Sequence, residues 1–273
     1  MELQSPYQII RVFNKPEEVQ GNRAAVIIES NHVDLTADRS KISADMYNNN
    51  GIDTTCFISM VTNDHYNVQC FNNKNAIQCC GHGMIAAAKT IFSICEISKV
   101  TINNNIYASL NSDKTLSLSL PRLSAQIVSP PNWFDDMLLF KDKTYLPSKA
   151  ALSDKDDGYL LLEFEDKLPI DVFRGLQVDL KTICENTNRA IVLVQFNQEK
   201  QHLYIRYFAP QYGVKEDSAT GSVMRFVGDY IEKKYQCSTF EVSQCSTQGG
   251  YMKIECEEER IVISAHAKIE SVQ

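Results

Sequence analysis

One order of elements occurs twice along this chain of 273 residues, and that repeat constrains the fold more than any other feature. Hydrophobic periodicity predicts a helix, two paired strands, a glycine-containing turn, a second helix and further strands, first in one half and then in the other. Phe71 ends a strand pair nine residues before Cys80, and Phe208 stands nine residues before Asp217. Each phenylalanine precedes a glycine turn and a helix. The pattern favours two similar halves, each a sheet curved around one helix.

The predicted elements follow this repeat, and a chance likeness of two ordinary strand–turn–helix units is the alternative. In the first half they are a helix over 35–47 with Asp34 as its N-cap, strands over 54–61 and 66–71, a helix after 80–83, and strands over 99–103, 106–111 and 116–120. In the second half they are strands over 158–164, 190–196 and 202–208, a short helix over 179–184, a helix from within 218–222 to about 234, and strands over 240–243, 251–256 and 261–266. We expect an N-terminal lobe over 1–121, which the C-terminal strand can complete, and a C-terminal lobe over 122–273.

Composition and charge exclude several classes of protein. The formal charge is −7 and no basic block occurs, which argues against nucleic acid as a partner. Residues 75–88 form the longest uncharged apolar stretch worth considering, and they are too few and too polar for a membrane span of about 20 residues. Residues 1–13 lack the pattern of a secretory signal. With 44% hydrophobic residues, the chain is expected to be a globular protein of the cytoplasm.

Nine cysteines raise the question of disulfides or metal. No C-x-x-C pair occurs, and the ligand spacings of zinc sites are missing. An odd number of cysteines without a signal peptide fits reduced thiols, most of them buried as small hydrophobic side chains. We therefore expect no metal.

The two turns before the predicted helices are the strongest candidates for a site. The start of a helix presents N–H groups and a partial positive charge, so it attracts carboxylates. If the halves pack face to face, residues 80–83 and 217–222 direct their N–H groups into one cleft, where a small anionic carboxylate would bind. In the competing interpretation the glycines only permit tight turns, and Asp217 only caps a helix.

Asp53 is a third candidate because it lies between an Asn-rich turn and an apolar strand. A carboxylate at the edge of a strand can act as an acid or a base. The alternative is an aspartate that only forms the turn.

Four stretches, in one order across nearly the whole chain, resemble a known family. They are residues 21–26 (Gly-Asn-Arg-Ala-Ala-Val), 52–57 (Ile-Asp-Thr-Thr-Cys-Phe), 80–88 (Cys-Gly-His-Gly-Met-Ile-Ala-Ala-Ala), and 208–210 (Phe-Ala-Pro) with 216–222 (Glu-Asp-Ser-Ala-Thr-Gly-Ser). The chain resembles the PhzF-like (phenazine biosynthesis-like) isomerases, relatives of diaminopimelate epimerase. The resemblance implies an α+β fold of two lobes, each a β-barrel-like mixed sheet around a central helix. It also implies a cofactor-independent active site between the lobes, and a homodimer.

The resemblance also implies roles for single residues. Asp53 stands where the family has a catalytic glutamate, His82 matches the histidine of its Gly-His motif, and Asp217 matches the aspartate of its Glu-Asp-x-Ala-Thr-Gly-Ser motif. The residues expected to contact the substrate are Asn22, Cys80, Gly81, Gly83, Thr220, Gly221 and Ser222.

Three positions and one segment depart from the family pattern. Asp replaces Glu at position 53, Arg23 replaces a proline, and Ala76 stands where an acidic residue is common. The segment 244–250 resembles the family's glutamine-glycine-arginine segment only loosely, because the arginine is absent.

The leading hypothesis is an isomerase that shifts a proton on a small carboxylated metabolite without metal, flavin or nicotinamide. Asp53 would move the proton, while His82 and Asp217 orient the substrate or assist the transfer. One alternative is a diaminopimelate epimerase-like racemase that uses Cys80, whose place at a helix start predicts a lowered thiol pKa and fast alkylation. The other alternative is a non-catalytic binding or scaffold protein with the same fold. No phosphate-binding loop or hydrolase elbow competes with these.

Overall fold

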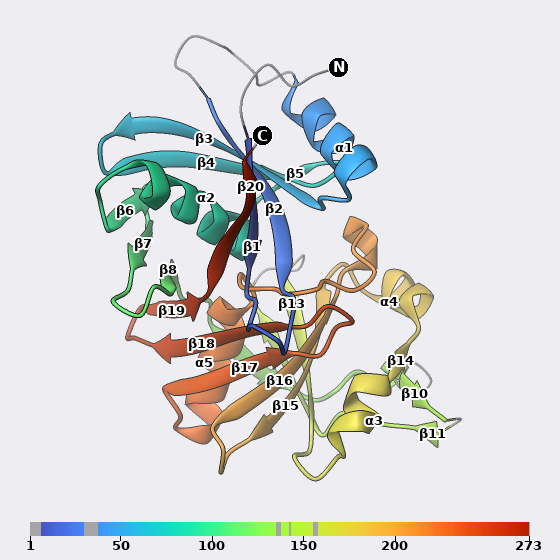
Figure 1. The fold of residues 1–273 in the computed structure, drawn as a ribbon. Helices are drawn as coiled ribbons and strands as arrows, with labels where there is room; N and C mark the ends of the chain where they lie inside the picture. Colours follow the sequence, from blue (N-terminus) through green and yellow to red (C-terminus); the bar gives the residue numbers. More distant parts are fainter. Residues whose placement is uncertain (1–6, 30–37, 135–137, 142, 155–157, 273) are drawn as a thin grey trace. The chain divides into compact units, whose positions relative to one another are not determined.

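The computed structural model describes residues 7–29, 38–134, 138–141, 143–154 and 158–272 (Figure 1). Its contacts divide the chain into two compact units, one formed by Met1–Pro121 with Val262–Gln273 and the other by Arg122–Ile261. Both units contain strands and helices, so the predicted α+β class is confirmed. Asp34 and Leu35, predicted to begin the first helix, lie outside the described residues.

The first unit is a mixed sheet around one buried helix. Its strands are β1 (Tyr7–Val12), β2 (Asn22–Ile28), β3 (Thr54–Thr62), β4 (His65–Phe71), β5 (Ala76–Ile77), β6 (Lys99–Ile102), β7 (Ile106–Leu110), β8 (Leu116–Pro121) and β20 (Ala267–Val272). β2 and β3 are parallel, β3 and β4 antiparallel, β4 and β6 parallel, and β6 and β7 antiparallel. The C-terminal strand β20 pairs with β1 and so belongs to this unit.

The central helix of this unit is α2 (Gly81–Ile94), which packs against β1, β2, β3, β8 and β20. Ala86, Ala87 and Ala88 are completely buried, because small side chains let strands approach the helix closely. The other helix, α1 (Arg39–Asn50), ends where Gly51 takes the left-handed conformation at φ +62°. The helix therefore continues to Asn50, beyond the predicted end at Tyr47.

The second unit repeats the same pairing order. Its main sheet contains β9 (Ala125–Val128), β12 (Lys149–Ser153), β13 (Tyr159–Phe164), β15 (Ala190–Asn197), β16 (His202–Phe208), β17 (Thr239–Gln244) and β18 (Gly250–Cys256). β13 and β15 are parallel, β15 and β16 antiparallel, β16 and β17 parallel, and β17 and β18 antiparallel. Phe71 and Phe208 end the corresponding strands β4 and β16. The predicted internal repeat is thus present in the strand pairing.

The remaining elements are not part of the repeated strand pairing. They are the helices η1 (Asn132–Phe134), α3 (Ile170–Gly175), α4 (Leu180–Asn186) and η2 (Pro210–Tyr212), a small sheet of β10 (Leu138–Phe140), β11 (Lys143–Thr144) and β14 (Gln177–Val178), and β19 (Arg260–Ala265), which contains the division between the units. Asp179 caps α4 by accepting a hydrogen bond from the Lys181 amide.

The central helix of the second unit is α5 (Met224–Tyr235), and it begins later than predicted. Residues 218–223 form bends, a turn and irregular backbone instead of the first helical turn. Side chains from β17 and the loop after it hold this segment, as described below, and they bond the Thr220 amide and the Ser218 carbonyl. The prediction that the helix begins within 218–222 is therefore wrong.

A buried carboxylate fixes the C-terminal end of α5 on the sheet. Glu163 of β13 is 1% exposed and accepts a hydrogen bond from the Tyr230 hydroxyl at 2.7 Å. Tyr235 and Lys234 also donate to Glu163. Burying a carboxylate is costly unless donors surround it, and here three donors come from α5.

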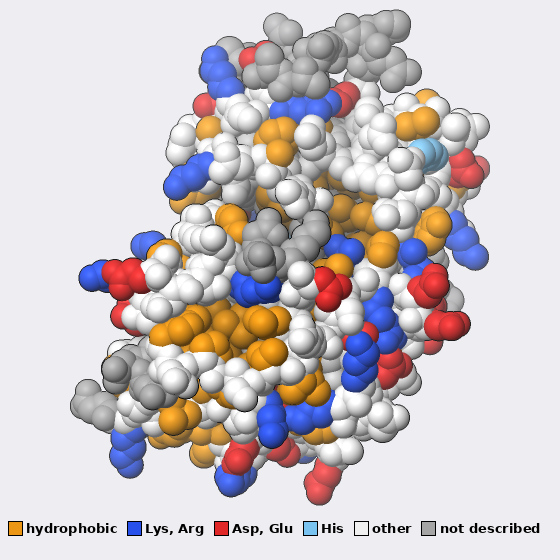
Figure 2. Space-filling model, turned by 180° about the vertical axis from the view of Figure 1, so that it is seen from behind, with side chains coloured by type: hydrophobic (Ala, Val, Ile, Leu, Met, Phe, Trp, Pro, Cys, Tyr) orange, Lys and Arg blue, Asp and Glu red, His pale blue; other side chains and the backbone are white. Residues whose placement is uncertain are grey.

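Charged and hydrophobic side chains are mixed at the surface. On the face drawn in Figure 2, basic and acidic side chains intersperse around patches of hydrophobic ones. Large apolar side chains that reach solvent in the first unit include Ile28, Met60 and Ile94. Among the described residues, no helix has the length and apolar character that crossing a membrane requires.

The tyrosines on Glu163 predict a loss of stability at alkaline pH. Burial and the Glu163 carboxylate raise the pKa of Tyr230 far above its ordinary value, and burial with a hydrogen bond to Glu163 raises the pKa of Tyr235. The folded protein then keeps protons that the unfolded chain loses above about pH 10. The free energy of unfolding should fall as pH rises past 10.

Urea unfolding between pH 8 and 11 tests this expectation. Tyr230→Phe removes one such phenol, so the slope should become shallower by up to about 1.4 kcal/mol per pH unit. The matched control is Tyr47→Phe, because Tyr47 is 42% exposed. Equal slopes for the two variants would contradict the assignment.

Candidate active site

In the first unit, two predicted residues lie where parallel strands begin. β2 and β3 pair with Ala24 opposite Thr54, so both strands start at the same end of the unit. Asn22 is the first residue of β2 and is 4% exposed, and Asp53 directly precedes β3 with an exposed side chain. The fold therefore brings the amide and the carboxylate to one end of the sheet.

The start of α2 reaches this same end. β4 runs antiparallel to β3 with Thr55 opposite Phe71, and the chain then passes through β5 into α2. Cys80 is the N-cap residue, and the Met84 amide donates to the Cys80 carbonyl at 3.0 Å. The amides of residues 81–83 precede this bond and lie in the first turn, at the positive end of the helix dipole.

Gly83 allows this helix start to sit against the strands. A Cβ atom at position 83 would lie 2.7 Å from the sulfur atoms of Cys56 and Cys70, and 3.0 Å from that of Cys80. Since Cys56 lies on β3 three residues after Asp53, the contact sets α2 beside the strand that follows Asp53. Any side chain at position 83 would push the helix start away.

The three sulfur atoms around Gly83 form a buried thiol cluster of Cys56, Cys70 and Cys80. Cys56 and Cys70 are paired across β3 and β4, with 3.2 Å between their sulfur atoms. The Cys80 sulfur lies 3.7 Å from Nδ1 of His82. The cluster therefore contacts the imidazole at the start of α2.

The prediction of a low thiol pKa at Cys80 is wrong. The hydrogen bond with Cys70 and burial raise the pKa of the Cys80 thiol well above its ordinary value. The hydrogen bond with Cys56 and burial likewise raise the pKa of Cys70. At the Cys80 thiol, the neighbouring thiol and desolvation thus outweigh the helix dipole.

In the second unit, the other predicted residues lie in residues 217–222, which we call the Asp217 turn. The Asp217 amide donates to the Tyr207 carbonyl at 3.0 Å, which attaches the turn to the end of β16. The Thr220 hydroxyl donates to Oδ2 of Asp217 at 2.6 Å. Gly221 and Ser222 follow, and the Met224 amide donates to the Gly221 carbonyl as α5 begins. Asp217, Thr220, Gly221 and Ser222 therefore lie together.

Gln244, at the end of β17, holds this turn through three hydrogen bonds. Its Oε1 accepts from the Thr220 amide at 2.7 Å. Its Nε2 donates to the Asp217 carbonyl at 2.7 Å and to Oγ1 of Thr220 at 3.2 Å. Gln244 is 2% exposed, and its two bonds to Thr220 are buried away from water.

Further contacts clamp both sides of the turn. Arg206 of β16 donates to both carboxylate oxygens of Glu216, at 2.7 and 3.1 Å. The Ser246 hydroxyl donates to the Ser218 carbonyl at 2.6 Å. At position 250 a Cβ atom would lie 2.5 Å from Cβ of Ala219, so glycine there lets the turn pack on β18.

The residues that hold the Asp217 turn were missed by sequence reasoning. Arg206 and Gln244 lie 11 residues before and 27 residues after Asp217, too far along the chain for a local motif to connect them to the turn. The signal for Gln244 was weak: the segment 244–250 had only a loose likeness to a family motif. Within the described residues, no three His, Cys, Asp or Glu side chains form a group that could hold a metal ion.

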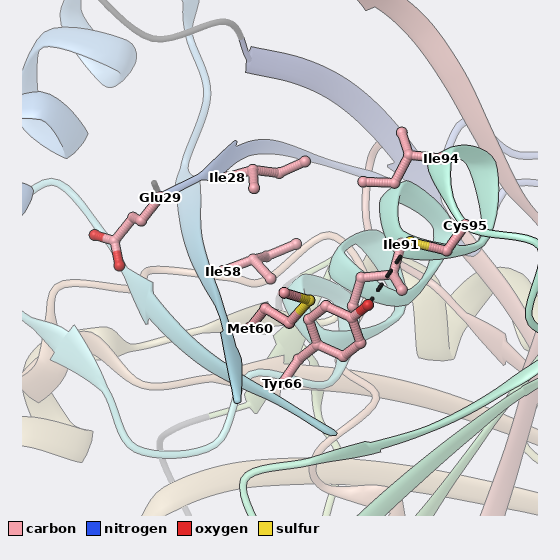
Figure 3. A pocket seen from close by; sticks show the side chains of 8 residues that line it. All are labelled: Ile28, Glu29, Ile58, Met60, Tyr66, Ile91, Ile94 and Cys95. Atoms are coloured by element: carbon pink, nitrogen blue, oxygen red, sulfur yellow. Dashed lines mark hydrogen bonds between the residues drawn. The ribbon is translucent and has the colours of Figure 1, made fainter. Parts of the chain in front are cut away.

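The first unit also contains an apolar pocket of about 270 Å³, drawn in Figure 3. It is lined by Ile28, Glu29, Ile58, Met60, Tyr66, Ile91, Ile94 and Cys95. The Tyr66 hydroxyl lies 3.7 Å from the Cys95 sulfur, while Glu29 turns away and binds Arg39. None of the predicted site residues lines this pocket.

Comparison with known proteins gives a consistent picture. The family model of the phenazine biosynthesis-like proteins (PhzC-PhzF) matches residues 11–271. An uncharacterized isomerase of Vibrio cholerae is 27% identical over 223 residues, which are 80% of this chain and 74% of that protein. A PhzF-family structure from Enterococcus faecalis covers 99% of this chain and 98% of its own, with a TM-score of 0.81 and 19% identity. A probable proline racemase from Agrobacterium radiobacter has a TM-score of 0.61 at 9% identity, over 99% and 92% of the two chains.

The buried thiol cluster predicts an order of alkylation. In the folded protein iodoacetamide should modify Cys184 before Cys80, because Cys184 is exposed whereas Cys80 is buried and keeps its proton. Peptide mass spectrometry of samples quenched over time gives the order, and a denatured sample should label all nine cysteines. Modification of Cys80 ahead of Cys184 would contradict this account of the cluster.

Proposed function

Because the chain belongs to the phenazine biosynthesis-like (PhzC-PhzF) protein family, we propose that it is an isomerase that shifts a proton on a small carboxylated metabolite without a cofactor. In this proposal the groups that bind and act on the substrate are Asn22, Asp53, the start of α2 and the Asp217 turn.

The observation that carries the proposal is the buried first turn of α2, with its backbone amides at the positive end of the helix dipole. Gly81, His82 and Gly83 are all buried in the first helical turn. Their amides point the same way as the positive end of the helix dipole, and such a group binds a carboxylate. The same amides would stabilise the negative charge that develops when the neighbouring carbon loses a proton.

Asp53 is the proposed base. It lies at the end of the unit where α2 begins, and its side chain is exposed, so a substrate can reach it. A positioned carboxylate that takes a proton from carbon and returns it to another atom completes an isomerisation with no net change in protons. His82 and Asp217 are proposed to orient the substrate and to assist the transfer.

The racemase alternative requires a thiolate at Cys80, and the geometry disfavours it. The thiol is buried against Cys70 and its pKa is raised, so little thiolate exists near neutral pH. A thiol racemase also needs a second base on the opposite face of the carbon. The alternative of a non-catalytic binding or scaffold protein predicts no turnover, so a measurement of turnover decides it.

The Asp53→Asn variant tests the proposed base. It keeps the size of the side chain and removes its basicity, so the rate should fall by about 10²–10⁴-fold while binding changes little. Turnover by the unaltered protein in deuterated water should place deuterium on a carbon of the substrate or product, read by NMR or mass spectrometry.

The control is Asp64→Asn, which alters an exposed aspartate in the β3–β4 turn of the same unit. It should leave both the rate and the deuterium incorporation unchanged. If Asp53→Asn instead lowers the melting temperature and leaves turnover per folded molecule intact, Asp53 is only a turn residue. Absence of any proton exchange by the unaltered protein would favour the scaffold alternative.

A further inference from the structure

The amide of Gln244 has one orientation that satisfies its neighbours. Its oxygen faces the Thr220 backbone N–H, which only donates, and its nitrogen faces the Asp217 carbonyl, which only accepts. Flipping the amide would set donor against donor and acceptor against acceptor. The hydrogen-bond network therefore determines which atom of Gln244 is nitrogen.

This orientation determines the direction of the Thr220 hydroxyl. The second hydrogen on Nε2 of Gln244 points to Oγ1 of Thr220, which accepts it at 3.2 Å. The hydroxyl has a single hydrogen of its own, and Oδ2 of Asp217 lies 2.6 Å away. Donation thus runs in one direction, from Gln244 to Thr220 and from Thr220 to Asp217.

We propose that Gln244 is a positioning residue that acts through Thr220 to hold the Asp217 carboxylate in one orientation, as a hydrogen-bond acceptor, for the reaction. The proposal rests on the proposed function, because it assigns Asp217 a part in the proton transfer. Gln244 itself acts only through Thr220 and the backbone of the turn.

We call the donation from Gln244 to Thr220 and from Thr220 to Asp217 the relay. Two features fix its geometry, which are the burial of its residues and the strand pairing that holds Gln244. Thr220 is 5% exposed and Gln244 is 2% exposed, so the bond between them lies out of water, where it is stronger and more directional. The bond from Thr220 to Asp217 is partly buried. Gln244 ends β17, which is paired with β16 on one side and β18 on the other, so its backbone is fixed by two neighbouring strands. Because the sheet fixes the Gln244 backbone, Gln244 and Thr220 hold the Asp217 side chain in a defined position relative to the sheet.

Gln244→Glu isolates the direction of donation, because it keeps the shape and the oxygen that accepts from Thr220 while it removes the donor. The Thr220 hydroxyl would then face two carboxylates. The matched control is Gln195→Glu: Gln195 is also 2% exposed in the second unit, and its Nε2 donates to backbone carbonyls of residues 165, 166 and 168. Thr220→Ser and Thr220→Val form a second pair, in which only serine keeps the hydroxyl.

The first measurement needs no substrate. Three-bond NMR couplings from the Thr220 methyl carbon to the backbone report its χ1 rotamer. The unaltered protein and Gln195→Glu should show one rotamer, and Gln244→Glu should show averaging. A single unchanged rotamer in Gln244→Glu would overturn the relay.

The second measurement is steady-state turnover per folded molecule, with stability followed by urea unfolding. Gln244→Glu should lower kcat by about 10- to 100-fold with KM changed far less, because a misplaced catalytic group affects the transition state most. Gln195→Glu should lose stability but keep kcat, and Thr220→Ser should keep more activity than Thr220→Val. An averaged rotamer with an unchanged kcat would overturn the positioning role.

The two measurements separate this inference from the proposed function. If the unaltered protein turns over no substrate, the proposed function fails and the positioning role fails with it, whereas the rotamer data still decide whether the relay exists. If the unaltered protein is active and Gln244→Glu is equally active, the inference alone fails.

Discussion

Enclosure of a helix within a curved sheet is the constraint on which each unit depends. A helix surrounded by strands must offer small residues where they come closest. α2 does so at Gly83, where three sulfur atoms leave no space for a side chain. α5 does so at Gly228, where a Cβ atom would lie 2.8 Å from Cδ1 of Ile261 and 3.3 Å from the Cys256 sulfur. The close approach at Gly83 also sets the start of α2 beside the strand that follows Asp53.

Much of this architecture could be predicted because it depends on local signals. Alternating strands, the alanine-rich segment after Gly83 and the equal spacing of Phe71 and Phe208 from the two turns all lie within short windows. The order of parallel and antiparallel pairing in the two units then agrees with the repeat. Helix boundaries were less predictable, since α5 begins only after a turn that distant side chains hold.

The site could be predicted only in part, for a physical reason. Motifs made Asp53, His82 and Asp217 the candidates, but the groups around them come from elsewhere in the chain. Cys80 illustrates the difference: its place at a helix start suggests an acidic thiol, whereas Cys70 from a neighbouring strand raises its pKa. Gln244 shows the reverse, because a residue with a weak sequence signal makes three hydrogen bonds to the Asp217 turn.

We have proposed that Asp53 and Asp217 serve one reaction. A double-mutant cycle of Asp53→Asn and Asp217→Asn, measured as kcat/KM per folded molecule, tests this proposal. Residues that act as one catalytic unit are strongly non-additive, so the double variant should lose about as much as the more damaged single variant. Losses that simply multiply would show that the two carboxylates act independently, and would contradict the account.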